Sequence, residues 1–228
     1  AAHCGLPPLP RLDLPAQPFR YLAWFRAAHA EIFFGRGQEI RTLYERIADP
    51  DGAPILLLYG QSGVGKSSLL EAGLLPRLAA EYMPYYVRRD RTLGLTQSLA
   101  AALCARTTNR TIPATWRDHE CIEKKPLVVV LDQVEEVFTR PQPLAAAIAA
   151  NATTAQAAAA ETLPEEWADL LCTLGQLFKE HSRRPQGKLI LSFRKEYLAE
   201  IEKRLSERGL PYGKFFLEPL SKRGMIEA

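Results

Sequence analysis

Long apolar runs are missing from this sequence of 228 residues. A membrane-spanning helix needs roughly 18 consecutive apolar residues, and the longest runs here are the much shorter Ile55–Tyr59, Leu127–Leu131 and Leu144–Ala150. The chain also lacks an opening basic segment followed by an apolar one, which would mark a secretory signal. These absences argue against a membrane-spanning protein, and we expect no membrane partner and a cytoplasmic location.

Cysteine and histidine are scarce, with 4 residues of each type. Cys4, Cys104, Cys121 and Cys172 lie far apart and show none of the spacings of metal or redox motifs. The histidines are scattered as well, so no zinc site can be argued from them. We therefore expect plain thiols in a reducing compartment.

Neither sign of charge is in large excess, because 29 basic and 26 acidic residues give a net charge of +3. Such a balance offers no electrostatic case for nucleic acid as a partner, although it does not exclude a local basic patch. Hydrophobic residues make up 47% of the chain and charged residues 24%, as in an ordinary globular protein. The length suffices for one large α/β domain, or for one domain and part of a second.

Short apolar segments alternate with segments of helical periodicity along the chain. The expected strands are Ile55–Tyr59, Pro84–Arg88, Leu127–Leu131, Lys188–Phe193 and Lys214–Leu217. The expected helices are Gln38–Ala48, Lys66–Ala80, Leu95–Ala105, Leu144–Ala160, Pro164–Ser182, Lys195–Leu205 and one that begins near Ser221. This alternation predicts an α/β fold whose mostly parallel sheet is covered on both faces. The proline-rich residues 1–18 predict an extended linker.

A phosphate-binding loop follows the first expected strand, and every fixed position of its pattern is filled. Glycine lets backbone N–H groups turn toward a phosphate, and the following helix adds its N-terminal donors. Lys66 would contact the β- and γ-phosphates, Ser67 would bind Mg²⁺, and Ser68 would touch the α-phosphate. The segment consists of Gly60, Gln61, Ser62, Gly63, Val64, Gly65, Lys66, Ser67 and Ser68. The alternative is a glycine turn that binds nothing.

Three acidic residues follow the third expected strand. Asp132 directly follows five apolar residues, so it should emerge at the carboxyl edge of the sheet, where open α/β sheets bind ligands. Its role there would be to hold Mg²⁺ through water. Glu135 or Glu136 is a candidate to polarise the attacking water. The alternative for these residues is an acidic helix start that the helix dipole favours. At the end of the fourth strand, Arg194 would sense or stabilise the γ-phosphate, or else form only a surface ion pair.

The sequence resembles the STAND class of signal-transduction ATPases, and most closely the bacterial branch called novel STAND. The resemblance spans about Tyr21 to Ala228. The similar segments are Phe33–Arg36 with Glu39 and Ile40, Gly60–Pro76, Leu131–Phe138, Leu191–Arg194 and Leu217–Ser221. Val134 departs from the family pattern, which usually has Phe at this position.

The resemblance implies a three-layer P-loop NTPase core with a five-stranded sheet of order 5-1-4-3-2 over residues 19–220. It implies that Phe34, Gly35 and Arg36 border the adenine and ribose, although Phe33 and Phe34 could equally be core residues. Residues 221–228 would begin a helical lid, with the winged-helix domain of the family lying beyond Ala228. The implied function is a slow ATPase switch that couples ATP and Mg²⁺ to self-association and to effector and sensor domains, in bacterial signalling or antiviral defence.

Three other functions compete with this interpretation. The first is a nucleotide-binding scaffold that never turns over, against which Glu135 and Glu136 argue. The second is an AAA+ ATPase acting on DNA, against which the missing basic stripe argues. The third is a small-molecule kinase, for which no acceptor pocket or arginine-rich lid can be identified.

Overall fold

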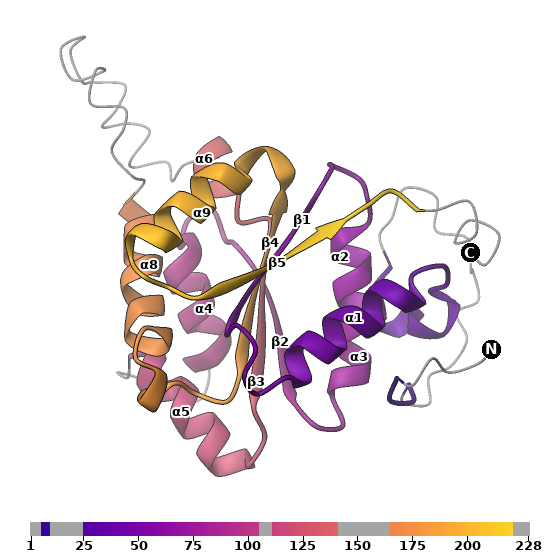
Figure 1. Cartoon of the computed structure of the whole chain (residues 1–228), viewed down its shortest axis with the longest axis horizontal. Coiled ribbons are helices and arrows are strands. Elements are labelled where there is room, and N and C mark those ends of the chain that lie inside the picture. Colours follow the sequence, from indigo (N-terminus) through magenta and orange to yellow (C-terminus); the bar gives the residue numbers. More distant parts are fainter. Residues whose placement is uncertain (1–5, 10–24, 105–110, 141–164, 221–228) are drawn as a thin grey trace, which may run out of the picture.

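A parallel five-stranded sheet forms the centre of the molecule in the computed structural model, which describes residues 6–9, 25–104, 111–140 and 165–220 (Figure 1). The strands run in the order β2-β3-β4-β1-β5. Read from the other edge this is 5-1-4-3-2, so the predicted order is confirmed. The strands are β1 (Ile55–Gly60), β2 (Met83–Arg88), β3 (Leu127–Asp132), β4 (Lys188–Arg194) and β5 (Tyr212–Leu217).

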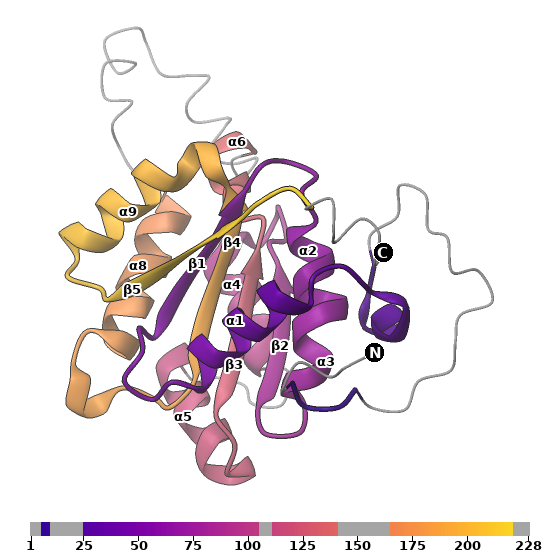
Figure 2. The same ribbon diagram turned by 45° about the vertical axis from the view of Figure 1, so that its right-hand side comes forward.

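Helices cover both faces of the sheet, which gives the three layers visible in Figures 1 and 2. The first face carries η1 (Ala27–Ile32), α1 (Gly37–Ala48) and the helical run of α2 (Lys66–Ser68), η2 (Leu69–Leu74) and α3 (Leu75–Leu78). The second carries α4 (Gly94–Cys104), α5 (Ile112–Glu123), α8 (Glu165–Phe178) and α9 (Leu198–Glu207). Shorter turns are α6 (Glu136–Thr139), η4 (His181–Arg183) and η5 (Lys195–Tyr197).

The continuous apolar runs of the central strands are explained by burial on both faces. In β1, Ile55 and Leu57 pack into the core under α4, α5, α8 and α9. Leu56 and Leu58 point the other way, into the core under α1 and the helical run after the phosphate loop. The same alternation in β3 leaves Asp132 on the face of the phosphate-loop helix, because side chains alternate with a period of two.

The helix predicted over Lys66–Ala80 contains a π-helical segment in its middle. Pro76 has no N–H group and its ring clashes with the fourth carbonyl before it. The N–H of Leu75 accordingly donates to the carbonyl of Leu70, five residues back, which is the π pattern. Gly73 lies in this segment, where a Cβ would come within 2.8 Å of Ile40 in α1.

Among the described residues, α5 is the one α-helix longer than four residues that was not predicted, and several predicted boundaries shift. Thr111 caps α5 by accepting a hydrogen bond from the N–H of Ala114. The predicted helix Pro164–Ser182 is α8, which ends at Phe178. The predicted helix Lys195–Leu205 begins as the 3₁₀ turn η5 and continues as α9 to Glu207.

Several predictions lie outside the described residues. They are the alanine-rich helix Leu144–Ala160, the helix from Ser221 and most of the linker at residues 1–18. Only residues 6–9 of that linker are described, and they contain no helix or strand. Among all described residues, no helix combines the length and apolarity that crossing a bilayer requires.

Candidate functional site

The phosphate loop connects β1 to α2 at the carboxyl edge of the sheet. Gly63 and Gly65 have φ values of 75° and 96°, in the left-handed region that favours glycine. Gly60 is required for a different reason, because a Cβ there would lie 2.6 Å from the carbonyl oxygen of Leu217 in β5. The glycines therefore shape the loop and also let it lie against the neighbouring strand.

Lys66 begins α2 and folds back over the loop. Its Nζ donates hydrogen bonds to the carbonyls of Gly60 at 3.1 Å and Gln61 at 3.0 Å. Burial lowers the pKa of the Lys66 ammonium, and the nearby carboxylates of Glu135 and Asp132 oppose that shift. The ammonium is thus a cation held at the loop and partly withdrawn from water.

Asp132 lies at the end of β3, only 1% exposed, within reach of three donors. Its Oδ2 accepts hydrogen bonds from the Ser67 hydroxyl at 2.6 Å and the Tyr86 hydroxyl at 2.5 Å. Nη2 of Arg88 lies 3.6 Å from the same oxygen. Burial, and then the Asp132 carboxylate, raise the pKa of Tyr86, so its hydroxyl keeps its proton and acts as the donor.

Three buried polar atoms of this region have no hydrogen-bond partner among the described residues. They are Oδ1 of Asp132, Oε2 of Glu135 and Oγ of Ser192. Ser192 is paired in register with Asp132 on the neighbouring β4, so the two side chains lie on the same face of the sheet. Buried polar groups are normally hydrogen-bonded, and these unpaired atoms therefore fit a site that takes up a polar ligand.

Glu135 and Glu136 are placed differently, although they are neighbours in the sequence. Glu135 is 5% exposed, and its Oε1 lies 3.2 Å from Nε of Arg194. Burial raises the pKa of the Glu135 carboxyl, while Lys66 and Arg194 act in the opposite direction. Glu136 instead forms an ion pair with Arg140, one turn further along, at 3.1 Å.

The phosphate loop and the residues that follow β3 line one pocket of about 640 Å³. Its lining includes ten of the predicted site residues, namely Ser62, Gly63, Gly65, Lys66, Ser67, Ser68, Asp132, Glu135, Glu136 and Arg194. It also includes Phe25, Arg88, Gln133, Thr139 and Arg140, which were not predicted. Gly60, Gln61 and Val64 belong to the loop but do not line this pocket.

The predicted adenine and ribose residues lie beside the loop without lining the pocket. Arg36 is 5% exposed and donates to the carbonyls of Val64 at 3.0 Å and Glu218 at 2.9 Å. It therefore ties the phosphate loop to the segment after β5. Gly35 has a φ of 79° and Phe34 is 47% exposed. A role of these residues at the base stays a prediction.

The residues missed by sequence reasoning come from two places. Phe25 lies in the segment before η1, and its N–H donates to the Ser68 hydroxyl at 3.1 Å. Tyr86 and Arg88 lie on β2, where alternation puts both on the face of Asp132. That alternation was readable from the sequence, but the pairing of β2 with β3 comes from the topology.

Comparison with solved structures gives likenesses to an ORC2 protein and to ORC proteins. The Aeropyrum pernix ORC2 protein, in its ADPNP-ADP complexes, matches with a TM-score of 0.55 at 13% identity over 83% of this chain and 49% of that one. Drosophila ORC bound to GC-rich DNA and Cdc6 matches with a TM-score of 0.53 at 13% identity over 84% of this chain. The chain thus spans about half of the archaeal chain, and 30% of the Drosophila chain. At such identity the likeness concerns the fold alone.

A comparison with curated protein sequences gave no match. The family model described as Novel STAND NTPase 1 matches residues 18–228, which is most of the chain and includes every residue of the site. The match agrees with the parallel sheet, the phosphate loop and the carboxylate at the end of β3. The chain belongs to the Novel STAND NTPase 1 family.

Proposed function

We propose that the chain binds ATP with Mg²⁺ and hydrolyses it slowly, as the switch domain of a larger bacterial signalling or defence protein. The observation that carries the proposal is the 2.6 Å hydrogen bond between the Ser67 hydroxyl and Asp132. It joins the phosphate loop to the strand-end carboxylate, beside a pocket that also holds the Lys66 ammonium.

The donor set at this position fits a magnesium ion. Mg²⁺ prefers oxygen ligands and is usually bound through one or two protein groups together with phosphates and waters. Ser67 and Asp132 would hold it, and the unpartnered Oδ1 of Asp132 offers a further acceptor for a bound water. Bound there, the ion would neutralise charge on the β- and γ-phosphates.

The remaining groups take roles that follow from their charge and burial. Lys66 leaves its two loop carbonyls to contact the β- and γ-phosphates. Glu135 accepts a proton from the water that attacks the γ-phosphorus, while the bond to the β-phosphate oxygen breaks and ADP leaves. A carboxylate whose pKa is raised by burial is a better base near neutral pH than an ordinary glutamate. Arg194, paired with Glu135, would turn toward the γ-phosphate.

Coupling to the rest of a larger protein is part of the same proposal. Residues 19–220 would form the NTPase core, preceded by the linker and followed from residue 221 by a helical lid. Nucleotide state would then control self-association and the activity of effector and sensor domains. Membership in the Novel STAND NTPase 1 family supports this coupling.

The test is to measure ATP binding by calorimetry and phosphate release, with and without Mg²⁺. Lys66→Ala should lower ATP affinity by at least about tenfold, since a charge-assisted contact contributes roughly 1.5–3 kcal/mol. Asp132→Asn should weaken only the Mg²⁺-dependent part of binding. Lys203→Ala and Asp169→Asn, at exposed positions, are the matched controls.

Equal ATP affinity in Lys66→Ala and the wild type would contradict the assignment of the phosphate-binding site. Binding without phosphate release in the wild type supports a scaffold instead.

A DNA-acting ATPase is the second candidate, because the Drosophila ORC to which the chain is similar is bound to DNA. A DNA-binding surface requires clustered positive charge, and binding should then weaken steeply with salt. The net charge of +3 favours the switch. Anisotropy of labelled duplex DNA at two salt concentrations decides between them, since salt-sensitive binding supports the second candidate.

A further inference from the structure

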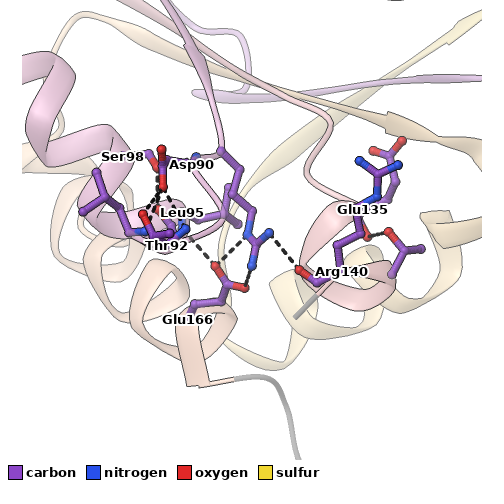
Figure 3. Close-up of polar contacts among 11 residues, drawn as sticks. Asp90, Thr92, Leu95, Ser98, Glu135, Arg140 and Glu166 are labelled. Atoms are coloured by element: carbon purple, nitrogen blue, oxygen red, sulfur yellow. Dashed lines mark hydrogen bonds and ion pairs between the residues drawn. The ribbon is translucent and has the colours of Figure 1, made fainter. Parts of the chain in front are cut away.

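Arg89 follows the last residue of β2 and has a fully buried side chain. Its guanidinium makes a two-pronged contact with Glu166 at the start of α8, from Nε to Oε2 at 2.9 Å and from Nη2 to Oε1 at 2.5 Å. Its Nη1 donates to the carbonyl of Arg140 at 2.9 Å. Figure 3 shows these contacts: dashed lines lead from the guanidinium to Glu166 and to the carbonyl of Arg140, and Glu135 lies away from the guanidinium.

Glu166 is fixed in its turn by the backbone of α4. Its Oε2 also accepts a hydrogen bond from the N–H of Leu95 at 3.0 Å. A planar guanidinium held by a carboxylate on one side can present its remaining N–H groups in only one direction. That direction is the carbonyl of Arg140. Taking both charges out of water costs free energy that offsets most of the attraction between them, so a buried ion pair adds little net stability to a fold. The geometry that it imposes is its main contribution here.

The carbonyl that Arg89 holds belongs to Arg140, the C-cap residue that follows α6. This helix has only four residues, Glu136–Thr139, so it has few bonds of its own and depends on its anchors. On the strand side, the N–H of Val134 donates to the carbonyl of Ser192 at 3.1 Å. At the other end, Arg89 holds the carbonyl of Arg140. Val137 and Phe138 add apolar packing, since Val137 is buried and the Phe138 ring lies against Trp167 and Tyr197.

Glu135 is tied to this helix as its N-terminal cap residue. Its carbonyl accepts hydrogen bonds from the N–H groups of Phe138 at 3.0 Å and Thr139 at 3.1 Å. A shift of α6 would therefore carry the backbone of Glu135 with it. Because general-base catalysis depends on placement within a hydrogen-bond length, a small shift would separate the carboxylate from its water.

We propose that Arg89, oriented by Glu166, is a positioning residue that holds α6 and so keeps Glu135 in place for ATP hydrolysis. The inference rests on the proposed function. Arg88, the preceding residue, points to the other face of the sheet and lines the pocket. The end of β2 therefore contacts the pocket through Arg88, and through Arg89 it contacts the C-cap residue of α6, the helix that Glu135 caps. Arg89 itself does not line the pocket, and its effect on catalysis is indirect.

The experiment compares two changes at the pair. Removing one charge alone would leave the other buried and unpaired, so Arg89→Met is combined with Glu166→Leu. Arg89→Lys keeps the charge but loses the fork geometry, and it remains informative if the double variant does not fold. We expect the rate of phosphate release to fall at least about tenfold, as for loss of catalytic placement, while the ATP dissociation constant is unchanged. Turnover equal to wild type in both variants overturns the proposal.

A matched control pair lies on the surface of α9, where Arg204 contacts Glu200 at 2.7 Å. The double change Arg204→Met and Glu200→Leu should leave turnover and binding as in the wild type. If the control pair lowers turnover as much as the buried pair, a general loss of stability explains the result and the positioning role is overturned.

Hydrogen exchange of the Phe138 and Thr139 amides separates this inference from the proposed function. Faster exchange at these amides in Arg89→Lys, with unchanged exchange in the sheet, supports the hold on α6 even if the wild type shows no turnover. Absent turnover in the wild type would contradict the proposed hydrolysis. Unchanged exchange would overturn the hold on α6, whatever the turnover.

Discussion

The hydroxyl of Tyr86 donates a 2.5 Å hydrogen bond to Oδ2 of Asp132. The same oxygen receives the Ser67 hydroxyl, so one carboxylate oxygen is shared between the phosphate loop and strand β2. Partners of this kind fix the orientation of a metal-binding carboxylate, and their loss usually weakens metal binding. Tyr86 therefore belongs to the environment of the proposed Mg²⁺ site, although no motif marks it.

We expect Tyr86→Phe to weaken Mg²⁺-dependent ATP binding by roughly tenfold. The phenyl ring keeps the packing and removes only the donor to Asp132. A Mg²⁺ titration of nucleotide binding measures the effect. Tyr85→Phe is the control, because the Tyr85 hydroxyl lies 3.2 Å from Nδ1 of His119 and not at Asp132. Equal Mg²⁺ dependence in Tyr86→Phe and Tyr85→Phe would contradict the assignment.

The two glutamates after β3 should differ in their effect on turnover. Glu135→Gln removes the buried carboxylate that we propose as the base, and it should slow phosphate release by roughly 100-fold or more, while ATP binding is preserved. Glu136→Gln should have a small effect, because Glu136 is paired with Arg140 at the edge of the pocket. Single-turnover phosphate release with each variant measures the difference. If Glu136→Gln slows phosphate release more than Glu135→Gln does, Glu136 is the residue that positions the attacking water, and the other assignments in the site stand.

The parts of the site that were predictable from the sequence are those set by local pattern. The position of Asp132 at the end of an apolar run placed it at the sheet edge, and the structure has it 2.6 Å from the hydroxyl of Ser67. Tyr86 could not be placed, because its contact with Asp132 depends on which strand pairs with β3. Arg89 and Glu166 are 77 residues apart, and no local pattern pairs residues at that distance.

The fold shows the same division between local and long-range information. Strand order followed from the family resemblance, while the strands themselves followed from apolar runs. The π-helical segment at Leu69–Leu74 was missed because helical periodicity does not show how one proline, Pro76, displaces the hydrogen bonds before it. The helix α5 was missed because its mixed composition has no strong apolar stripe.

Gly73 should be required for packing of the phosphate-loop helix. A Cβ at this position would come within 2.8 Å of Ile40 and 3.0 Å of Phe33. Overpacking a core typically costs about 1–3 kcal/mol, so we expect Gly73→Ala to lower the free energy of unfolding by that amount. Gly175→Ala in α8 is the matched control, since nothing lies within 4 Å of its Cβ. There alanine should stabilise the helix by up to about 1 kcal/mol. Chemical denaturation measures the free energy of unfolding of both variants. If Gly73→Ala is as stable as the wild type, α1 can move aside to make room for the added methyl group.

Glu135 should lower the stability of the fold at neutral pH. Burial raises the pKa of its carboxyl above that in the unfolded chain, so the folded state binds the proton more tightly than the unfolded state. The free energy of unfolding therefore falls as pH rises from the ordinary glutamate pKa through the raised one. Glutamine does not ionise, and Glu135→Gln should accordingly melt at a higher temperature than the wild type at pH above that window.

At pH below about 4, the glutamate side chain of the wild type is protonated and, like the glutamine of Glu135→Gln, neutral. The melting temperatures of the wild type and the variant should therefore converge. Thermal melts of the wild type and Glu135→Gln across this pH range measure the difference. Glu136→Gln is the control, because its ion pair with Arg140 is solvent-exposed on the arginine side and such pairs contribute little. A Glu135→Gln variant that is less stable than the wild type at neutral pH would mean that the ion pair with Arg194 outweighs the desolvation of the carboxylate. The carboxylate proposed as the base would then stabilise the fold at neutral pH, and its burial would not lower the free energy of unfolding.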